Sequence, residues 1–157
     1  MTTNKFSPKG KVKQVTASIL NPENAGLRFI VNVVGQNGKF ESKLGLMLAK
    51  RWLTVREGYK SWFAGQQNFK LGSINSTPVA SDTWAVNLLC EDKTGKATDD
   101  TLMLAAKNLG ALAKYEHATV HVSNMLTEAH PGLVAALDKH LVEQGVSVYY
   151  YNEPTQG

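Results

Sequence analysis

The run from Phe29 to Val34 constrains the fold of this chain more than any other segment. Its sequence, FIVNVV, is apolar and rich in β-branched residues, with Asn32 as the single polar residue. A strand of this kind must be covered on both faces, which is typical of parallel sheets that carry helices on each side. Lys11–Ala17 alternates apolar and polar residues instead, which indicates a half-buried strand. The two patterns together favour a layered α/β protein.

Strand-like and helix-like segments alternate along the rest of the chain. Apolar residues at helical spacing predict four helices, at residues 42–52, 55–62, 99–113 and 131–144. Apolar or β-branched runs predict further strands, at residues 69–74, 83–89, 119–122 and 146–151. A polar turn containing Pro78 and a loop after Val122 are expected between them. Crossover connections of this kind predict a three-layer α/β/α fold with a mixed, mostly parallel central sheet.

Length and composition fit one domain. The chain has 157 residues, of which 43% are hydrophobic and 19% charged, as in globular rather than disordered proteins. We expect a flexible lead-in at residues 1–10, one domain at residues 11–151 and a short tail at residues 152–157. No segment is apolar for long enough to span a bilayer, and the lysine-rich first residues lack a signal-peptide core. A cytoplasmic protein without membrane association is therefore expected.

Charge and cysteine content exclude some site chemistries and leave others open. Cys90 is the only cysteine, so an internal disulfide and a cysteine-based metal site within one chain are excluded. The net charge of +4 permits an anionic partner without requiring one. Nucleic-acid binding through the basic N-terminal half remains an alternative, although the sequence has no dense basic stripe and no recognised motif.

Several segments, in their order and spacing, resemble a macro domain. In that family a buried strand with an Asn leads into a glycine-rich loop, a helix, a Tyr and a Leu-Gly strand. The matching segments here are Ile30–Gly38, Leu44–Trp52, Tyr59–Trp62 and Leu71–Gly72. The resemblance extends from Val12 to Tyr150, because later strands and the last helix also follow the family's order. It implies binding of ADP-ribose or a related nucleotide, and some members hydrolyse ADP-ribosyl groups.

The resemblance also assigns ligand-binding positions, and at most of them this chain departs from the family. Ser18 stands at the position of an Asp that bonds the adenine amino group. Glu41–Lys43 replaces a Gly-x-Gly run whose bare amides bind phosphate, and Ser123–Glu128 replaces a second glycine-rich loop. Glu41 would repel a diphosphate, whereas Lys43 would attract it. The expected ligand-binding residues are Ser18, Asn32, Gly38, Ser42, Lys43, Asn124 and Thr127.

These departures predict a binding protein with an altered pocket rather than an efficient hydrolase. No Asp or Lys matches the family's catalytic positions, so no catalytic residue, metal ligand or cofactor is assigned. One alternative is a protein that keeps the fold and acts through a protein partner or self-association. In that case Glu41, Lys43, Met125 and Leu126 would fill the cleft. The other alternative is weak nucleic-acid binding.

Individual residues keep two interpretations. Asn32 fits either the ligand site or a structural bond to its surroundings, because a buried amide needs partners. Gly38 fits either the phosphate loop or a simple positive-φ turn. Tyr59 and Trp62 fit either a base-stacking surface or, as helical spacing favours, core packing. His121 alternates with two valines and is expected to face solvent or a pocket wall.

Overall fold

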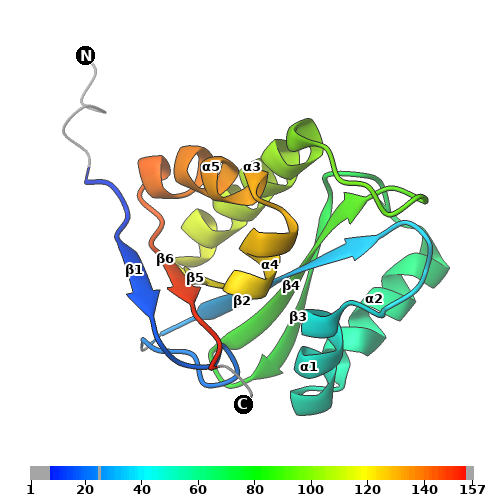
Figure 1. Cartoon of the computed structure of the whole chain (residues 1–157), viewed down its shortest axis with the longest axis horizontal. Helices are drawn as coiled ribbons and strands as arrows, with labels where there is room; N and C mark the ends of the chain where they lie inside the picture. The colour runs from blue at the N-terminus through cyan, green and yellow to red at the C-terminus, as the bar shows by residue number, and fades with distance from the viewer. Residues whose placement is uncertain (1–7, 25, 155–157) are drawn as a thin grey trace.

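The computed structural model describes residues 8–24 and 26–154, which form a six-stranded sheet between helices (Figure 1). Residues 1–7 of the expected lead-in and residues 155–157 of the expected tail lie outside the described residues. The strands are β1 Val12–Val15, β2 Arg28–Gly35, β3 Ile74–Ala80, β4 Thr83–Glu91, β5 Thr119–Ser123 and β6 Val148–Tyr151. The helices are α1 Lys43–Arg51, α2 Thr54–Gly65, α3 Asp99–Glu116, α4 Asn124–Ala129, α5 Gly132–His140 and the 3-10 helix η2 Val142–Gln144.

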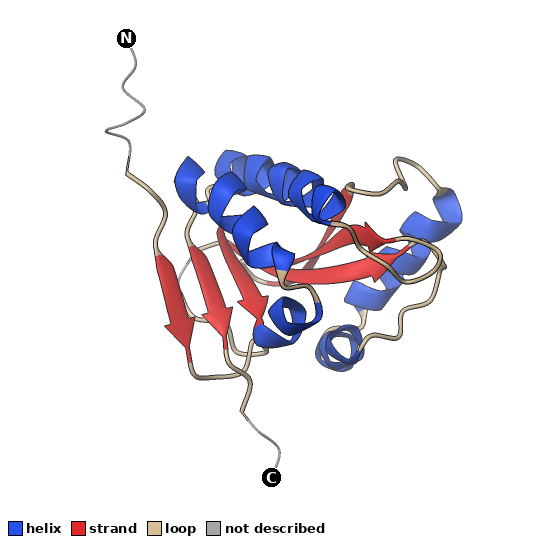
Figure 2. Ribbon diagram, turned by 45° about the horizontal axis from the view of Figure 1, so that its top comes forward, coloured by secondary structure: helices blue, strands red, loops and turns tan. Residues whose placement is uncertain are grey.

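The strand order across the sheet is β1-β6-β5-β2-β4-β3. Only β3 runs antiparallel to its neighbour, and every other pairing is parallel. Helices α3 and α5 pack together over one face of the sheet, while α1 and α2 lie on the other (Figure 2). The predicted α/β class and mixed, mostly parallel sheet are therefore confirmed. No helix among the described residues is long and apolar enough to cross a bilayer.

The parallel strands β2, β4 and β5 position the functional edge of the sheet. Residues 29–35 of β2 and residues 85–90 of β4 are buried, as their apolar runs require when both faces are covered. Because these strands are parallel neighbours, their carboxyl ends meet at one edge. In open α/β sheets ligands bind outside the carboxyl ends of the strands. A ligand-binding site is therefore expected at that edge.

The prediction of a strand at residues 69–74 is wrong, because β3 begins only at Ile74. Pro78 lies inside β3, opposite Trp84, rather than in a turn. A proline is tolerated there because β3 is an edge strand, where one side of the backbone needs no partner. Phe69 instead packs edge-on against Trp62, with ring centroids 5.0 Å apart. Aromatic packing therefore overrides the strand-like pattern of this segment.

The prediction of a loop after Val122 is also wrong, because α4 follows β5 directly. The Ser123 hydroxyl accepts a hydrogen bond of 3.1 Å from the Met125 amide, which caps this helix. The helix expected at residues 131–144 is divided into α5 and η2, with Leu141 between them. The turn-like polar residues of α4 hid its helical character from sequence reasoning.

His121 is fully buried and does not face solvent or a pocket wall. Its strand, β5, lies inside the sheet between β6 and β2, and residues 120–123 of this strand are buried. The imidazole stacks on Tyr149 with ring centroids 4.7 Å apart. Both of its nitrogens have partners, Tyr151 and Thr119, each at 2.8 Å. The role of this histidine is structural.

Candidate ligand-binding cleft

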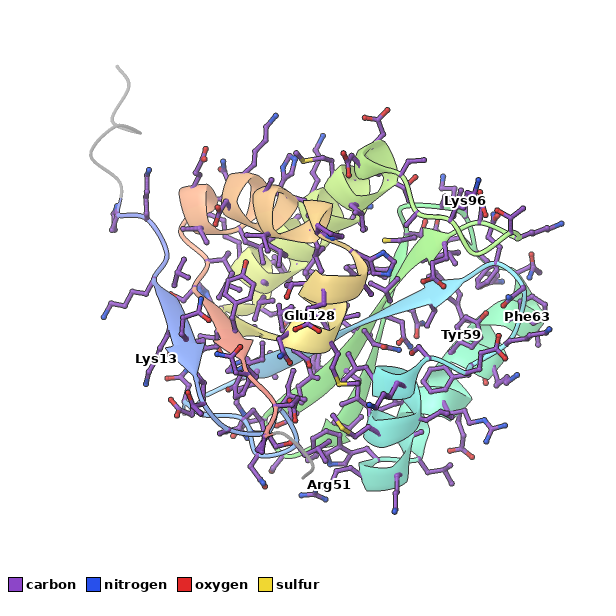
Figure 3. All side chains as sticks on the ribbon, viewed as in Figure 1. Lys13, Arg51, Tyr59, Phe63, Lys96 and Glu128 are labelled. Atoms are coloured by element: carbon purple, nitrogen blue, oxygen red, sulfur yellow. The ribbon has the colours of Figure 1, made fainter. Side chains whose placement is uncertain are left out.

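A cavity of about 470 Å³, here called the cleft, opens at the carboxyl edge of β2 and β4. Val33 and Glu91 supply its strand side. The first turn of α1, residues 42–44, forms one wall, and residues 125–126 and 128–130 at α4 form the other. Figure 3 shows Glu128 on α4, above α1. The cleft thus lies between the start of α1 and α4, two helices that are far apart in the sequence.

The first turn of α1 presents unpaired donors to the cleft. Ser42 caps the helix by accepting a 3.0 Å hydrogen bond from the Gly45 amide, and its carbonyl accepts the Leu46 amide. The amides of Lys43 and Leu44 have no hydrogen-bond partner within the part of the chain that the structure describes. Such amides carry the partial positive charge of a helix N-terminus. With the exposed Lys43 ammonium beside them, they make this turn suitable for an anion.

In the loop between β2 and α1, the Gly38 and Lys39 amides already have protein partners. Gly38 donates to the Tyr59 hydroxyl at 3.0 Å, and that hydroxyl donates to the Gly35 carbonyl. The Lys39 amide donates to the Asn37 side chain at 2.9 Å. Burial raises the pKa of Tyr59, so its hydroxyl stays protonated and holds the loop. These amides are therefore not free to bind phosphate.

Gly38 has the positive φ, +80°, that its sequence context favoured. A Cβ atom at this position would stand 2.6 Å from the Phe63 ring. Both the backbone conformation and the close approach of the ring require glycine. Gly38 therefore shapes the loop, and it lies outside the lining of the cleft.

Asn32 is bonded inside the sheet. Its side-chain amide donates to the Asn87 carboxamide oxygen at 3.0 Å. Asn32, Asn87 and Asn75 are in register across β2, β4 and β3. Because alternate residues of a strand face opposite sides, it is the neighbouring Val33 that lines the cleft. The side-chain oxygen of Asn32 is buried without a partner among the described residues, so both interpretations of this residue stay open.

Ser18, Asn124 and Thr127 are not in the lining of the cleft. The Glu153 carboxylate accepts the Ile19 amide at 2.8 Å, directly after Ser18. The Glu153 amide donates to the Asn124 side chain at 3.3 Å, and Thr127 donates to the Asn124 carbonyl. Of the seven residues expected to bind ligand, the structure places only Ser42 and Lys43 in the cleft. Glu153 was missed because only the pairing of β1 with β6 brings it near Ser18.

Sequence reasoning also missed a contact between two polar side chains in the cleft. His130 follows α4, and its Nε2 lies 3.3 Å from a carboxylate oxygen of Glu91, the last residue of β4. The side chain of His130 is only 12% exposed, so this contact is largely shielded from water. A segment read as a loop gave no reason to place His130 opposite Glu91. With Glu128, the pair puts two carboxylates in the lining of the cleft.

The cleft is open although bulky residues replace the expected glycines. Lys43, Met125 and Leu126 line it without filling it, and Glu41 lines an adjoining recess of about 40 Å³. Within residues 8–24 and 26–154, no three His, Cys, Asp or Glu side chains come together as a metal site. Burial raises the pKa of Cys90 to about 12, so this thiol is not a ready nucleophile.

Comparisons with known proteins identify the fold. No family model and no curated protein matches the sequence. A macrodomain protein from Streptomyces coelicolor superposes with a TM-score of 0.84 at 18% identity, over 92% of this chain and 100% of that one. The macrodomain of Thermus aquaticus DarG gives 0.70 at 17% identity, over 91% and 99%. Thermosipho africanus DarTG, solved in complex with ADP-ribose, gives 0.63 at 11% identity, over 83% of this chain and 39% of that one.

This chain therefore has the macrodomain fold, as the resemblance in its sequence predicted. The Streptomyces structure is matched over its whole length, so the likeness includes every layer of the fold. Identities of 11–18% establish the fold alone. The function must be argued from the residues of the cleft.

Proposed function

We propose that this protein binds ADP-ribose or a related nucleotide in the cleft, with the diphosphate against the first turn of α1. The observation that carries the proposal is an open cavity of about 470 Å³ lined by Ser42, Lys43 and Leu44. Two free amides and an ammonium group there provide the donors that a diphosphate requires. The ADP-ribose complex of Thermosipho africanus DarTG, which shares the fold, supports this class of ligand.

The proposed pose differs from one in which two glycine-rich loops hold the phosphates. Gly38 and Lys39 already donate their amides to Tyr59 and Asn37. On the other side of the cleft, the short helix α4 stands in place of the second loop. We therefore expect the ligand to draw anion contacts from the first turn of α1. The Ile19 amide, next to Ser18, is likewise occupied, because it donates to the Glu153 carboxylate.

We propose binding rather than efficient hydrolysis. The Glu91 carboxylate lies 3.3 Å from Nε2 of His130, a contact that competes with activation of a water molecule by this carboxylate. The Glu91 side of the cleft therefore favours holding a ligand over hydrolysing it.

Replacing Lys43 by Ala should weaken ADP-ribose binding roughly tenfold, because one charge-assisted contact to the diphosphate is lost. Isothermal titration calorimetry of the full chain measures this change. Lys50→Ala is the matched control, since Lys50 is exposed on the same helix but outside the lining of the cleft. Equal weakening by both variants, or no heat from the unmodified protein at millimolar ADP-ribose, would contradict the proposal.

A further inference from the structure

A second cavity lies beside the cleft, beyond the loop that joins β2 to α1. It has a volume of about 530 Å³ and is here called the Phe63 pocket; its lining is Gln36, Asn37, Phe63, Gln66, Phe69 and Lys93. The small recess between the two cavities shares Asn37 with the Phe63 pocket, and Ser42 and Glu91 with the cleft. Figure 3 shows Phe63 and Tyr59 on the side of the molecule opposite Lys13.

Two phenylalanines, Phe63 and Phe69, form the aromatic part of the Phe63 pocket, and other residues pack against Phe63. Phe63 stacks on Tyr59 with centroids 6.4 Å apart, and Phe69 meets Phe63 edge-on at 5.5 Å. The Gly38 backbone packs directly against the Phe63 ring. Both phenylalanines nevertheless remain partly exposed, on the side of the pocket. A ring fixed on one side and open on the other provides a stacking surface for a planar ligand.

The rim of the pocket combines neutral amides with one positive charge. Gln36, Asn37 and Gln66 offer carboxamide donors and acceptors, which match the edges of a nucleobase. Lys93 is the only charged residue in the lining. Its loop is firm, because the Asp92 carboxylate accepts the Thr94 amide at 2.8 Å and the Lys96 amide at 3.1 Å. A lysine without a carboxylate beside it in the pocket suits a phosphate.

We propose that the Phe63 pocket binds a nucleotide, with its base stacked on Phe63 and its phosphate at Lys93. This site goes beyond the function proposed for the cleft, from which it is separated by the recess. A free mononucleotide and one nucleotide of a single-stranded nucleic acid both carry this base and phosphate. The experiment below distinguishes these two ligands.

Fluorescence anisotropy of a labelled single-stranded oligothymidylate, with thymidine monophosphate as competitor, tests this proposal on the full chain. Phe63→Leu should weaken oligonucleotide binding roughly tenfold, whereas Phe63→Trp should preserve it because the stacking face remains. Lys93→Gln should weaken binding and reduce the slope of log affinity against log salt by about 0.7. Lys107→Gln, which removes the same charge from an exposed position on α3, should change neither.

Competition separates the two sources. A monophosphate that displaces the oligonucleotide at a similar concentration identifies a free nucleotide as the ligand, and weak displacement identifies a single strand. No binding of either probe at millimolar concentration would overturn the proposal. So would binding that is indifferent to both Phe63→Leu and Lys93→Gln. Thermal melting of each variant checks folding, and Lys93→Gln keeps the test decisive if Phe63→Leu unfolds.

The proposal for the cleft can fail independently. ADP-ribose binding should be unchanged in Phe63→Leu, and oligonucleotide binding should be unchanged in Lys43→Ala. If ADP-ribose gives no heat while oligonucleotide binding depends on Phe63, only the function proposed for the cleft is wrong. If ADP-ribose binding depends on Lys43 while oligonucleotide binding is unchanged in Phe63→Leu, only the proposal for the Phe63 pocket is wrong.

Discussion

Between pH 6.5 and about pH 3, His121 should lower the free energy of unfolding by up to about 1.4 kcal/mol per pH unit as the solution is acidified. Burial, aided by the positive charge of Arg28, lowers the pKa of His121 from 6.5 to about 3. The unfolded chain therefore takes up a proton in this range while the folded chain does not. The stabilisation is complete above pH 6.5, falls with acidification, and is lost at about pH 3.

The contacts of His121 explain why it resists protonation. The Tyr151 hydroxyl accepts the Glu23 amide at 2.8 Å and lies 2.8 Å from Nδ1 of His121. The other ring nitrogen, Nε2, lies 2.8 Å from the Thr119 hydroxyl. Burial raises the pKa of Tyr151 to about 12, which keeps this phenol a donor. A second proton on the ring would require both of these hydroxyls to accept from it.

Urea unfolding at several pH values measures the effect, and two variants isolate it. His121→Gln should be less stable than the unmodified protein at neutral pH by about 2–4 kcal/mol, because stacking and two buried hydrogen bonds are disturbed. Its stability should then fall less steeply with acid. His117→Asn removes an exposed histidine at a positive-φ position that Asn tolerates, so its slope should be unchanged. An imidazole NMR signal of His121 that titrates near pH 6.5 would contradict the assignment.

Glu128→Lys should strengthen ADP-ribose binding roughly tenfold, because a negative charge in the lining of the cleft becomes positive. The diphosphate is itself anionic, and Glu128 is exposed at the wall formed by α4. Screening by salt should reduce the gain, since the interaction crosses solvent. Calorimetric titrations at low and high ionic strength measure both effects.

Glu143→Lys is the matched control for this change. It makes the same charge reversal on η2, at an exposed residue outside the lining of the cleft. Its effect on affinity should be small, and Glu128→Gln should give about half the gain of Glu128→Lys on a free-energy scale. Equal gains from Glu128→Lys and Glu143→Lys would mean that net charge, rather than the cleft, determines affinity.

The sequence predicted the layers of the fold but not every element. Buried β-branched runs such as Phe29–Val34 have one compatible environment, so the parallel core of the sheet was predictable. Pro78 and the segment after Val122 were misread for a shared reason. A local pattern says neither that β3 lies at an edge nor that Ser123 caps a helix, because both depend on the position in the fold.

The site was less predictable than the fold because it depends on contacts between distant segments. Ser42 and Lys43 lie in the cleft, since the start of a helix that follows a parallel strand lies at the carboxyl edge of the sheet. The bond from Gly38 to Tyr59 and the contact of Glu153 with Ile19 join residues far apart in sequence. The pairing of His130 with Glu91 likewise requires α4. No spacing in the sequence encodes these partners.

Amide NMR during titration with ADP-ribose tests most directly whether α1, rather than the β2–α1 loop, receives the diphosphate. The Lys43 and Leu44 amides should shift most, because they lack protein partners within the described residues. The Gly38 amide should shift little, because Tyr59 already accepts its proton. Saturable binding with the largest shift at Gly38, and none at Lys43 or Leu44, would contradict this account of the cleft.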